Sequence, residues 1–250
     1  MYEEHPLFEK PADENAAIWR YLDFTKLVSL LDRQALFFAR ADKMPDPFEG
    51  SYSKANVRLR PDVYKDWPKE DFDKMMTSAA YASREIRRFT FLNCWHISEN
   101  ESAAMWKLNL KTDEGVAIRS TFQQLADSLK MYAEQRVYIG KIKYINYDTE
   151  WLPEGNTFYP FLYKRESFKH ECELRAVIQT LPIVDGAIDY RQPSPALGAY
   201  VPVDVNLLVE RVYVSPTAPA WFRELVGSVV TRYGLDKEVV RSELGDDPVY

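Results

Sequence analysis

Two short acidic segments of the chain carry side chains that could act on a ligand. Asp46 and Glu49 lie between prolines and a glycine, and Glu171 and Glu173 lie just before Arg175. Carboxylates in a loop can bind a divalent metal ion or a ribose hydroxyl. The first segment can also be structural, because an aspartate favours a turn and a glutamate pairs with arginine. We expect both of its acidic residues to meet arginines of the later segment.

The later segment predicts a charged strand. Residues two apart point to the same side of a strand, so Glu171, Glu173 and Arg175 would line one face. Cys172 and Leu174 would then point to the other face. A glutamate held by Arg175 could act on a substrate hydroxyl or stabilise a developing cation. The alternative is a structural ion-pair cluster, for which the candidate partners are Arg20, Arg40 and Lys164.

Aromatic residues bracket a predicted turn in the middle of the chain. Trp95 and His96 precede the turn, and Met105 and Trp106 follow it. The tryptophans could form a stacking wall of a ligand site, and His96 could exchange a proton near neutral pH. The alternative is that these residues fill the core and its rim.

The hydrophobic pattern predicts the elements that would position these residues. Strand patterns occur at 18–22, 36–40, 89–97, 115–119, 137–147, 173–178, 199–203, 209–214 and 239–242. Helical spacing occurs at 23–34, 68–88, 102–106, 122–132 and 219–234, and the aromatic segment 158–168 is expected to be partly helical. Residues 1–17 would form a loosely held arm. Residues 18–250 would form a single α+β domain, with a mixed, mostly antiparallel sheet and flanking helices.

Caps and apolar stripes define several of these helices more closely. Asp23 and Thr121 are expected to cap the helices that follow them. The helix at 68–88 is expected to bury the stripe Phe72, Met75, Met76, Ala79 and Ala80. The helix at 219–234 is expected to bury Trp221, Leu225, Val229 and Val230.

The composition narrows the classes of function. The 250 residues carry a net charge of −6, which argues against broad nucleic-acid binding because that needs a basic face. Cys94 and Cys172 are too few for a disulfide framework and indicate a reducing compartment. An acidic N-terminal segment and short apolar runs predict a cytoplasmic protein of bacterial type, with no membrane partner. Phosphate-binding glycine loops, serine-hydrolase elbows and zinc-site spacings are absent from the sequence, so we expect no metal site.

Five sequence elements together resemble the bacterial family catalogued as domain of unknown function 2971. In chain order they are Trp19-Arg20-Tyr21, Asp46-Pro47-Phe48-Glu49, Met105-Trp106, Gly115-Val116-Ala117-Ile118, and Lys164 with Glu171, Glu173 and Arg175. The resemblance runs from about residue 18 to residue 244. The chain departs from the family at Pro45, where the family has Asn, and at Asn109, where it has an aromatic residue.

The order of these residues is also similar to that of ADP-ribosyltransferases, with an arginine on the first strand and a late Glu-x-Glu. The similarity implies that Arg20 grips the phosphates of NAD and that Tyr21 or Trp106 stacks on the nicotinamide. Glu173 would bond a ribose hydroxyl and steady the oxocarbenium-like centre, and Glu171 would orient the acceptor. The remaining expected ligand contacts are Asp46, Glu49, His96 and Arg175.

Two further functions fit the same residues. A metal-dependent nuclease would hold magnesium with four carboxylates, although Arg175 stands where that class usually has lysine. A non-enzymatic binding or interaction module, in phage defence or signalling, would use the charged cluster as an internal brace or a ligand cradle. The transferase and the cradle would take a small-molecule or nucleotide ligand, with NAD as the expected cofactor of the enzyme.

Overall fold

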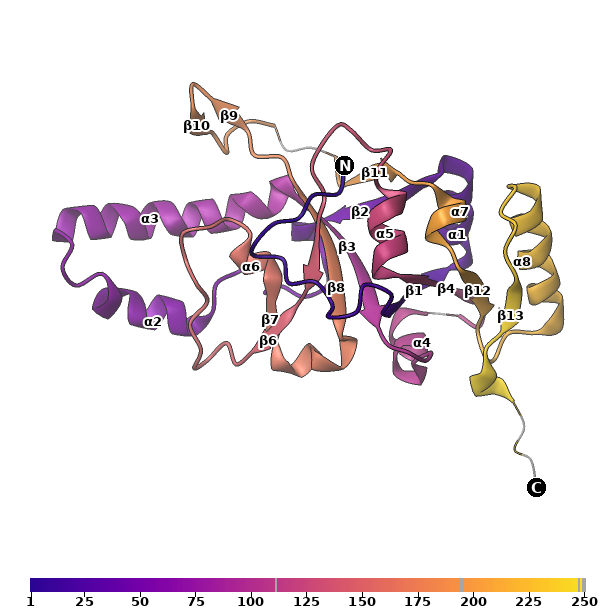
Figure 1. Cartoon of the computed structure of the whole chain (residues 1–250). Coiled ribbons are helices and arrows are strands. Elements are labelled where there is room, and N and C mark those ends of the chain that lie inside the picture. Colours follow the sequence, from indigo (N-terminus) through magenta and orange to yellow (C-terminus); the bar gives the residue numbers. More distant parts are fainter. Residues whose placement is uncertain (111, 194–195, 247, 249–250) are drawn as a thin grey trace.

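A nine-stranded mixed sheet, mostly antiparallel, forms the centre of the computed structural model, and helices flank it (Figure 1). The structure describes residues 1–110, 112–193, 196–246 and 248. The main path of the sheet runs β11-β2-β3-β1-β4-β12-β13, while β8 pairs with both β3 and β5. Only the pair β12–β13 is parallel within this described sheet. The predicted α+β class is confirmed.

The elements follow the chain from end to end. The central strands are β1 (Ala17–Asp23), β2 (Ala35–Arg40), β3 (Thr90–Ile97), β4 (Gly115–Thr121), β5 (Tyr138–Lys141), β8 (Glu173–Gln179), β11 (Gly198–Pro202), β12 (Arg211–Val214) and β13 (Val239–Arg241). Two small sheets join β6 (Lys143–Ile145) to β7 (Tyr163–Arg165) and β9 (Ile183–Val184) to β10 (Ala187–Ile188). The helices are α1 (Phe24–Arg33), α2 (Lys54–Val63), α3 (Lys69–Glu85), α4 (Ala103–Asn109), α5 (Phe122–Ser128), α6 (Tyr159–Leu162), α7 (Val205–Leu208) and α8 (Ala220–Arg232). Short 3₁₀ turns are η1 (Ala41–Lys43), η2 (Ile86–Phe89), η3 (Glu166–Glu171) and η4 (Glu243–Gly245).

The central sheet divides along β3, because two strands share one edge of it. Near the start of β3, Phe91 and Leu92 pair with β2. Near its end, His96 and Ile97 pair with β1. The opposite edge of β3 pairs continuously with β8. A gap therefore opens on the first edge, between β1 and β2.

Polar side chains bridge this gap where no strand lies beside β3. Nη1 of Arg20 donates to the carbonyl oxygen of Cys94 at 3.0 Å. Nδ2 of Asn93 donates to the carbonyl oxygen of Phe37 at 2.9 Å. Buried backbone groups need such partners because an unpaired carbonyl costs free energy. The two side chains thus stabilise the split, and Arg20 also lines the pocket that opens there.

The predicted helix starts are observed next to the sheet. Asp23 precedes α1, whose residues Leu27, Leu30 and Leu31 are buried in the main core as expected from their spacing. Asp23 itself makes no capping hydrogen bond through its side chain. The Thr121 hydroxyl does cap α5, accepting from the backbone N–H of Gln124 at 3.1 Å. Local sequence was sufficient to predict both helices because their stripes face the domain's own core.

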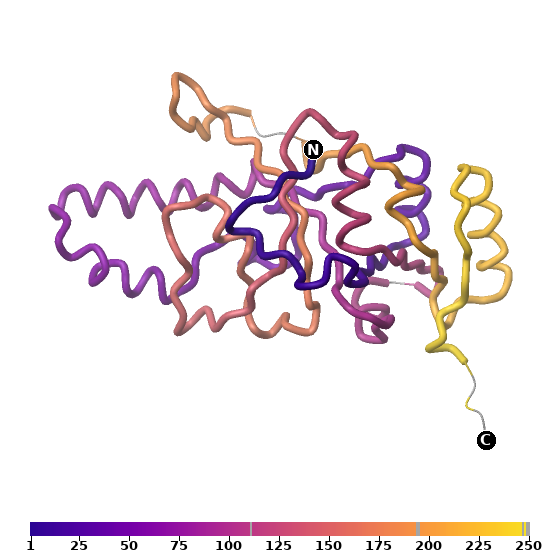
Figure 2. Tube along the Cα trace, in the orientation of Figure 1, coloured from indigo at the N-terminus to yellow at the C-terminus, as the bar shows by residue number. Residues whose placement is uncertain are grey.

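The predicted buried stripe on α3 is wrong. None of the side chains of α3, all of which the structure describes, is buried. The segment before it forms α2, for which the sequence predicted no helix, and the two helices extend together away from the sheet (Figures 1 and 2). The stripe therefore has no sheet face to cover.

The apolar face predicted for α8 is also partly wrong. Its buried residues are Phe222, Val226 and Val230, whereas the exposed fractions of Trp221 and Leu225 are 53% and 40%. Helical spacing fits either set of residues, since both recur every three to four positions. Contact with the core decides which face is buried.

The N-terminal arm is tied down rather than loose. The backbone N–H of Glu3 donates to Val137 at 3.0 Å and that of Lys141 to Glu9 at 2.8 Å, so the arm crosses β5. Phe8 lies in a side cluster of the core. The single strand predicted for 137–147 is divided, because β5 pairs with β8 whereas β6 leaves to pair with β7. Of the helices in the described ranges, none has the length and apolar character needed to cross a membrane.

Candidate ligand pocket

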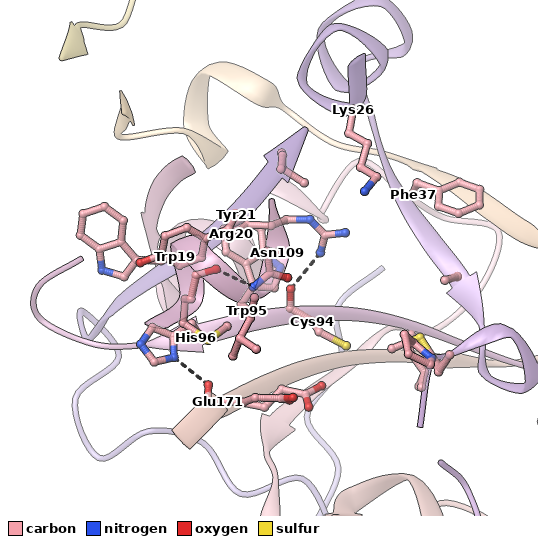
Figure 3. Close-up of a pocket in the computed structure, with 18 of the residues that line it drawn as sticks. Trp19, Arg20, Tyr21, Lys26, Phe37, Cys94, Trp95, His96, Asn109 and Glu171 are labelled. Carbon is pink, nitrogen blue, oxygen red and sulfur yellow. Dashed lines mark hydrogen bonds between the residues drawn. The ribbon is translucent and has the colours of Figure 1, made fainter. Parts of the chain in front are cut away.

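A pocket of about 780 Å³ opens at the split in the sheet (Figure 3). Its walls come from β1, β2 and β3, from the segment containing Asp46, from α4, and from the region between β7 and β8. A volume of this size is typical of sites for small molecules. The strands that diverge at β3 thus create a site between them.

Most of the predicted site residues meet in this pocket although they lie far apart in the sequence. Those that line it are Arg20, Tyr21, Asp46, Glu49, His96, Glu171 and Glu173. Trp106 and Arg175 lie behind its wall. Further lining residues that the sequence did not single out as ligand contacts include Lys26, Phe37, Asn109, Phe168, His170 and Tyr200.

Arg175 is the centre of a buried charged cluster at the base of the pocket. It is fully buried, and its Nη1 and Nη2 donate to the two carboxylate oxygens of Glu49 at 2.5 and 3.0 Å. Its Nε and Nη2 donate to Glu173 at 2.7 and 3.0 Å. The predicted meeting of Glu49 with an arginine of the late strand is confirmed. Bidentate pairing fixes both carboxylates in position.

Lys164 extends the cluster to Glu171. Its ammonium group lies 3.2 Å from Glu173 and also forms a short ion pair with Glu171. The expected shared strand face is wrong, because Cys172 has a left-handed backbone (φ 39°) and Glu171 ends η3. Glu171 therefore joins Glu173 through Lys164. Its carbonyl oxygen also lies 2.7 Å from Nδ1 of the buried His96.

The cluster holds three carboxylates and two cations, so its charges do not balance. Burial alone would raise the pKa of Glu173, but Arg175 and Lys164 outweigh that effect and hold it at about 2. Burial raises the pKa of the Glu49 carboxyl, against the opposing charge of Arg175. Glu173 is therefore held in its ionised form at neutral pH, whereas burial favours the protonated form of Glu49.

Asp46 forms a separate pair at the rim. Its Oδ1 accepts from Nη2 of Arg165 at 2.8 Å and from the backbone N–H of Phe48 at 3.0 Å. The expectation that Asp46 meets an arginine of the late strand is wrong, because Arg165 belongs to β7. The Arg165 guanidinium stacks over Phe48, 4.4 Å from the ring centre. Asp46 is thus a turn former and an ion-pair partner.

Arg20 is a cation that faces the pocket without an acidic partner. Among the described side chains no carboxylate pairs with it, and its Nη1 donates to the Cys94 carbonyl oxygen. Its guanidinium lies 5.8 Å from the ring centre of Trp95. Burial lowers the pKa of Arg20 to about 10, so the group stays protonated near neutral pH. Figure 3 shows it pointing into the cavity, near Asn109 and below Lys26.

The aromatic residues divide between the pocket wall and the packing behind it. The Tyr21 hydroxyl accepts from the backbone N–H of Ser102 at 2.8 Å, which holds that ring against the start of α4. Trp106 packs edge-on against Tyr21 at 5.0 Å and is only 3% exposed. Its indole Nε1 donates to Glu101 at 2.9 Å. Trp106 therefore supports Tyr21 instead of facing the cavity.

The donor set of the pocket does not resemble a metal site. Within the described ranges, no group of three or more His, Cys, Asp or Glu side chains is arranged to hold a metal ion. The four acidic residues expected for magnesium each pair with an arginine or lysine. Those cations occupy the carboxylate oxygens that a metal ion would need.

Comparison with protein-family models, curated proteins and solved structures finds no match. The resemblance to the bacterial family therefore stays a hypothesis.

Proposed function

We propose that this protein binds a nucleotide-type small molecule in the pocket, with NAD as the ligand we expect. The observation that supports it is Arg20, a protonated side chain without a carboxylate partner among the described residues, within an aromatic-lined cavity. A guanidinium can bind phosphate oxygens in a bidentate manner. Tyr21 and Phe37 line the same cavity and offer rings to a planar base.

The chemistry we propose for this site is ADP-ribosyl transfer. Glu173 lines the pocket, its pKa is depressed, and Arg175 and Lys164 hold it in place. An ionised carboxylate can stabilise the positive charge that develops on a ribose when the bond to nicotinamide breaks. Glu171 lies beside it through Lys164 and would orient the acceptor.

One observation favours a second function, that of a binding module without catalysis. Glu49, Glu171 and Glu173 all have cationic partners, so the cluster can serve as a brace that shapes the pocket. A carboxylate that is fully paired is a weaker base than a free one. In this case the pocket would bind the same ligand and release it unchanged.

Thermal unfolding with added NAD or magnesium tests the proposal. We expect NAD to raise the midpoint, since a ligand that binds the folded state stabilises it, and magnesium alone to leave the midpoint unchanged. A midpoint unaffected by NAD would contradict the proposal. A nicotinamide-release assay with the wild type and Glu173→Gln then separates the two functions: release that the substitution abolishes supports the transferase, and no release by either supports the module.

A further inference from the structure

The pocket has two chemically different ends, with Arg20 between them (Figure 3). At one end the lining side chains include His96 and Glu171. At the other end they include Lys26 and Phe37, which Figure 3 shows on the far side of Arg20. The first end is polar and carries carboxylates, whereas the second end is aromatic. A ligand that fills the whole pocket must therefore carry different groups at its own two ends.

A pair of rings at one edge of the sheet forms the aromatic end. Phe37 on β2 and Tyr200 on β11 are Cα partners across the two strands, and their ring centres lie 5.1 Å apart. Both rings line the pocket, and their exposed fractions are 42% and 43%. Exposed rings of this size present apolar surface that a planar group of a ligand would cover.

Neighbouring residues hold both rings in place. A Cβ at position 198 would lie 2.0 Å from Cζ of Phe37, so Gly198 leaves room for that ring. The Tyr200 hydroxyl lies 3.3 Å from Oγ of Ser29, and the Arg33 guanidinium lies 4.2 Å from the centre of the Tyr200 ring. Arg33 is not among the described residues that line the pocket, so it supports the ring from outside. Rings that are already held in place lose little freedom when a ligand binds.

We propose that Phe37 and Tyr200 bind the adenine of the ligand, so that the pocket takes a dinucleotide in preference to a mononucleotide. This inference rests on the proposed function, which places the nicotinamide ribose at Glu173. Arg20 lies between the two ends, where the diphosphate joins the two halves of the dinucleotide. A guanidinium suits that position because it can bind phosphate oxygens in a bidentate manner.

Charge sets the direction in which the dinucleotide lies. The nicotinamide ring of NAD is cationic, and the carboxylates of the polar end outnumber the cations that pair with them. The guanidinium of Arg33 beside Tyr200 disfavours a cationic ring at the aromatic end. Adenine is neutral and stacks on aromatic side chains through its π face. Charge and ring stacking therefore assign one half of the ligand to each end.

Calorimetric titration of NAD and of nicotinamide mononucleotide tests the proposal, since the mononucleotide lacks the adenosine half. We expect the wild type to bind NAD about tenfold more tightly than the mononucleotide or better, the usual scale for one stacked base. Phe37→Ala and Tyr200→Ala should each weaken NAD binding by about tenfold and leave mononucleotide binding unchanged. Tyr200→Phe keeps the ring and should bind NAD like the wild type.

Tyr81→Ala is the matched control, because Tyr81 is an exposed ring on α3 and is not among the described residues that line the pocket. We expect it to bind both ligands like the wild type. Thermal unfolding checks that every variant keeps its fold.

The outcomes separate this inference from the proposed function. Equal affinities of the wild type for the two ligands would overturn the inference and leave the proposed function standing. Ring variants that bind NAD normally, or that weaken both ligands alike, would do the same. A wild type that binds neither ligand would contradict the proposed function and the inference together.

Discussion

Arg20 on β1 donates a hydrogen bond to the carbonyl oxygen of Cys94 on β3, at 3.0 Å, across the gap where the sheet divides. One side chain therefore satisfies a backbone group of the split sheet and places a cation in the pocket. The second donor of the guanidinium fork remains available to a ligand because Arg20 pairs with no carboxylate among the described residues. The fold and the proposed binding site thus depend on the same residue.

Replacing Arg175 by methionine should strongly destabilise the protein. The substitution keeps an unbranched side chain but leaves the buried carboxylates of Glu49 and Glu173 without their shared partner. Removing one partner of a buried ion pair lowers the free energy of unfolding by about 3–5 kcal/mol. Urea unfolding measures the change. Arg165→Met is the control, because Arg165 is partly exposed and its pair with Asp46 should contribute no more than about 1 kcal/mol. Equal losses in the two variants would show that Arg175 is not the centre of the cluster.

The low pKa of Glu173 predicts how the stability of the protein depends on pH. Its pKa in the folded protein is about 2, compared with an ordinary value of 4.5. A carboxyl with a depressed pKa stabilises the fold above its unfolded pKa and loses that contribution as the pH falls through the folded value. The free energy of unfolding should therefore decline between about pH 4.5 and pH 2, and Glu173→Gln should flatten that decline. Identical slopes for the two proteins would contradict the assignment.

Substitution of Gly50 should destabilise the protein for two reasons. Its φ of +69° lies in the left-handed region, and a Cβ there would lie 2.3 Å from Cε1 of Phe161. Gly155 also has a positive φ, +97°, but a Cβ there would meet nothing within 4 Å. We expect Gly155→Ala to cost about 1–2 kcal/mol from backbone strain alone, and Gly50→Ala to cost clearly more. Thermal unfolding of the two variants compares them, and an equal cost would show that Phe161 moves aside freely.

The two cysteines should differ in their rates of alkylation. Burial raises the pKa of the Cys94 thiol, which lines the pocket, whereas Cys172 is exposed. The thiolate is the reactive form, so iodoacetamide should label Cys172 first at neutral pH. Peptide mass spectrometry follows both sites. Faster labelling of Cys94 would contradict its raised pKa and its lower exposure.

The sequence predicted the features that depend on contacts between neighbouring residues or on attraction between opposite charges. The leucines of α1 and the Thr121 cap follow from spacing alone. The pairing of Glu49 with Arg175 followed from the expectation that the charges of the late strand need partners of opposite sign. The incomplete burial of the α3 stripe could not be predicted, because its amphipathic pattern is the same whether a helix covers its own sheet or projects from it. The split at β3 depends on which distant strands pair with each other. The hydrophobic pattern of one strand does not carry that information.

The left-handed turn at Cys172 shows the same limit on a smaller scale. Strict alternation predicted that Glu171 and Glu173 share a strand face, but one residue with a φ of 39° ended the strand between them. The two glutamates still meet, because Lys164 pairs with both. Charge complementarity thus included Lys164 among three candidate partners, while the choice of partner and the path of the backbone required the structure.

The most direct test of the central claim is calorimetric titration of NAD into the wild type, Arg20→Lys and Arg20→Met. Methionine fills the gap beside Cys94 without a charge, and lysine keeps the charge. Arg223→Ala, an exposed arginine on α8, is the control. We predict that the wild type and the control bind NAD equally, that Arg20→Lys retains part of the affinity, and that Arg20→Met loses at least about tenfold, the usual effect of removing one charge-assisted hydrogen bond. No binding by the wild type, or unchanged affinity in Arg20→Met with its melting midpoint preserved, would contradict the account.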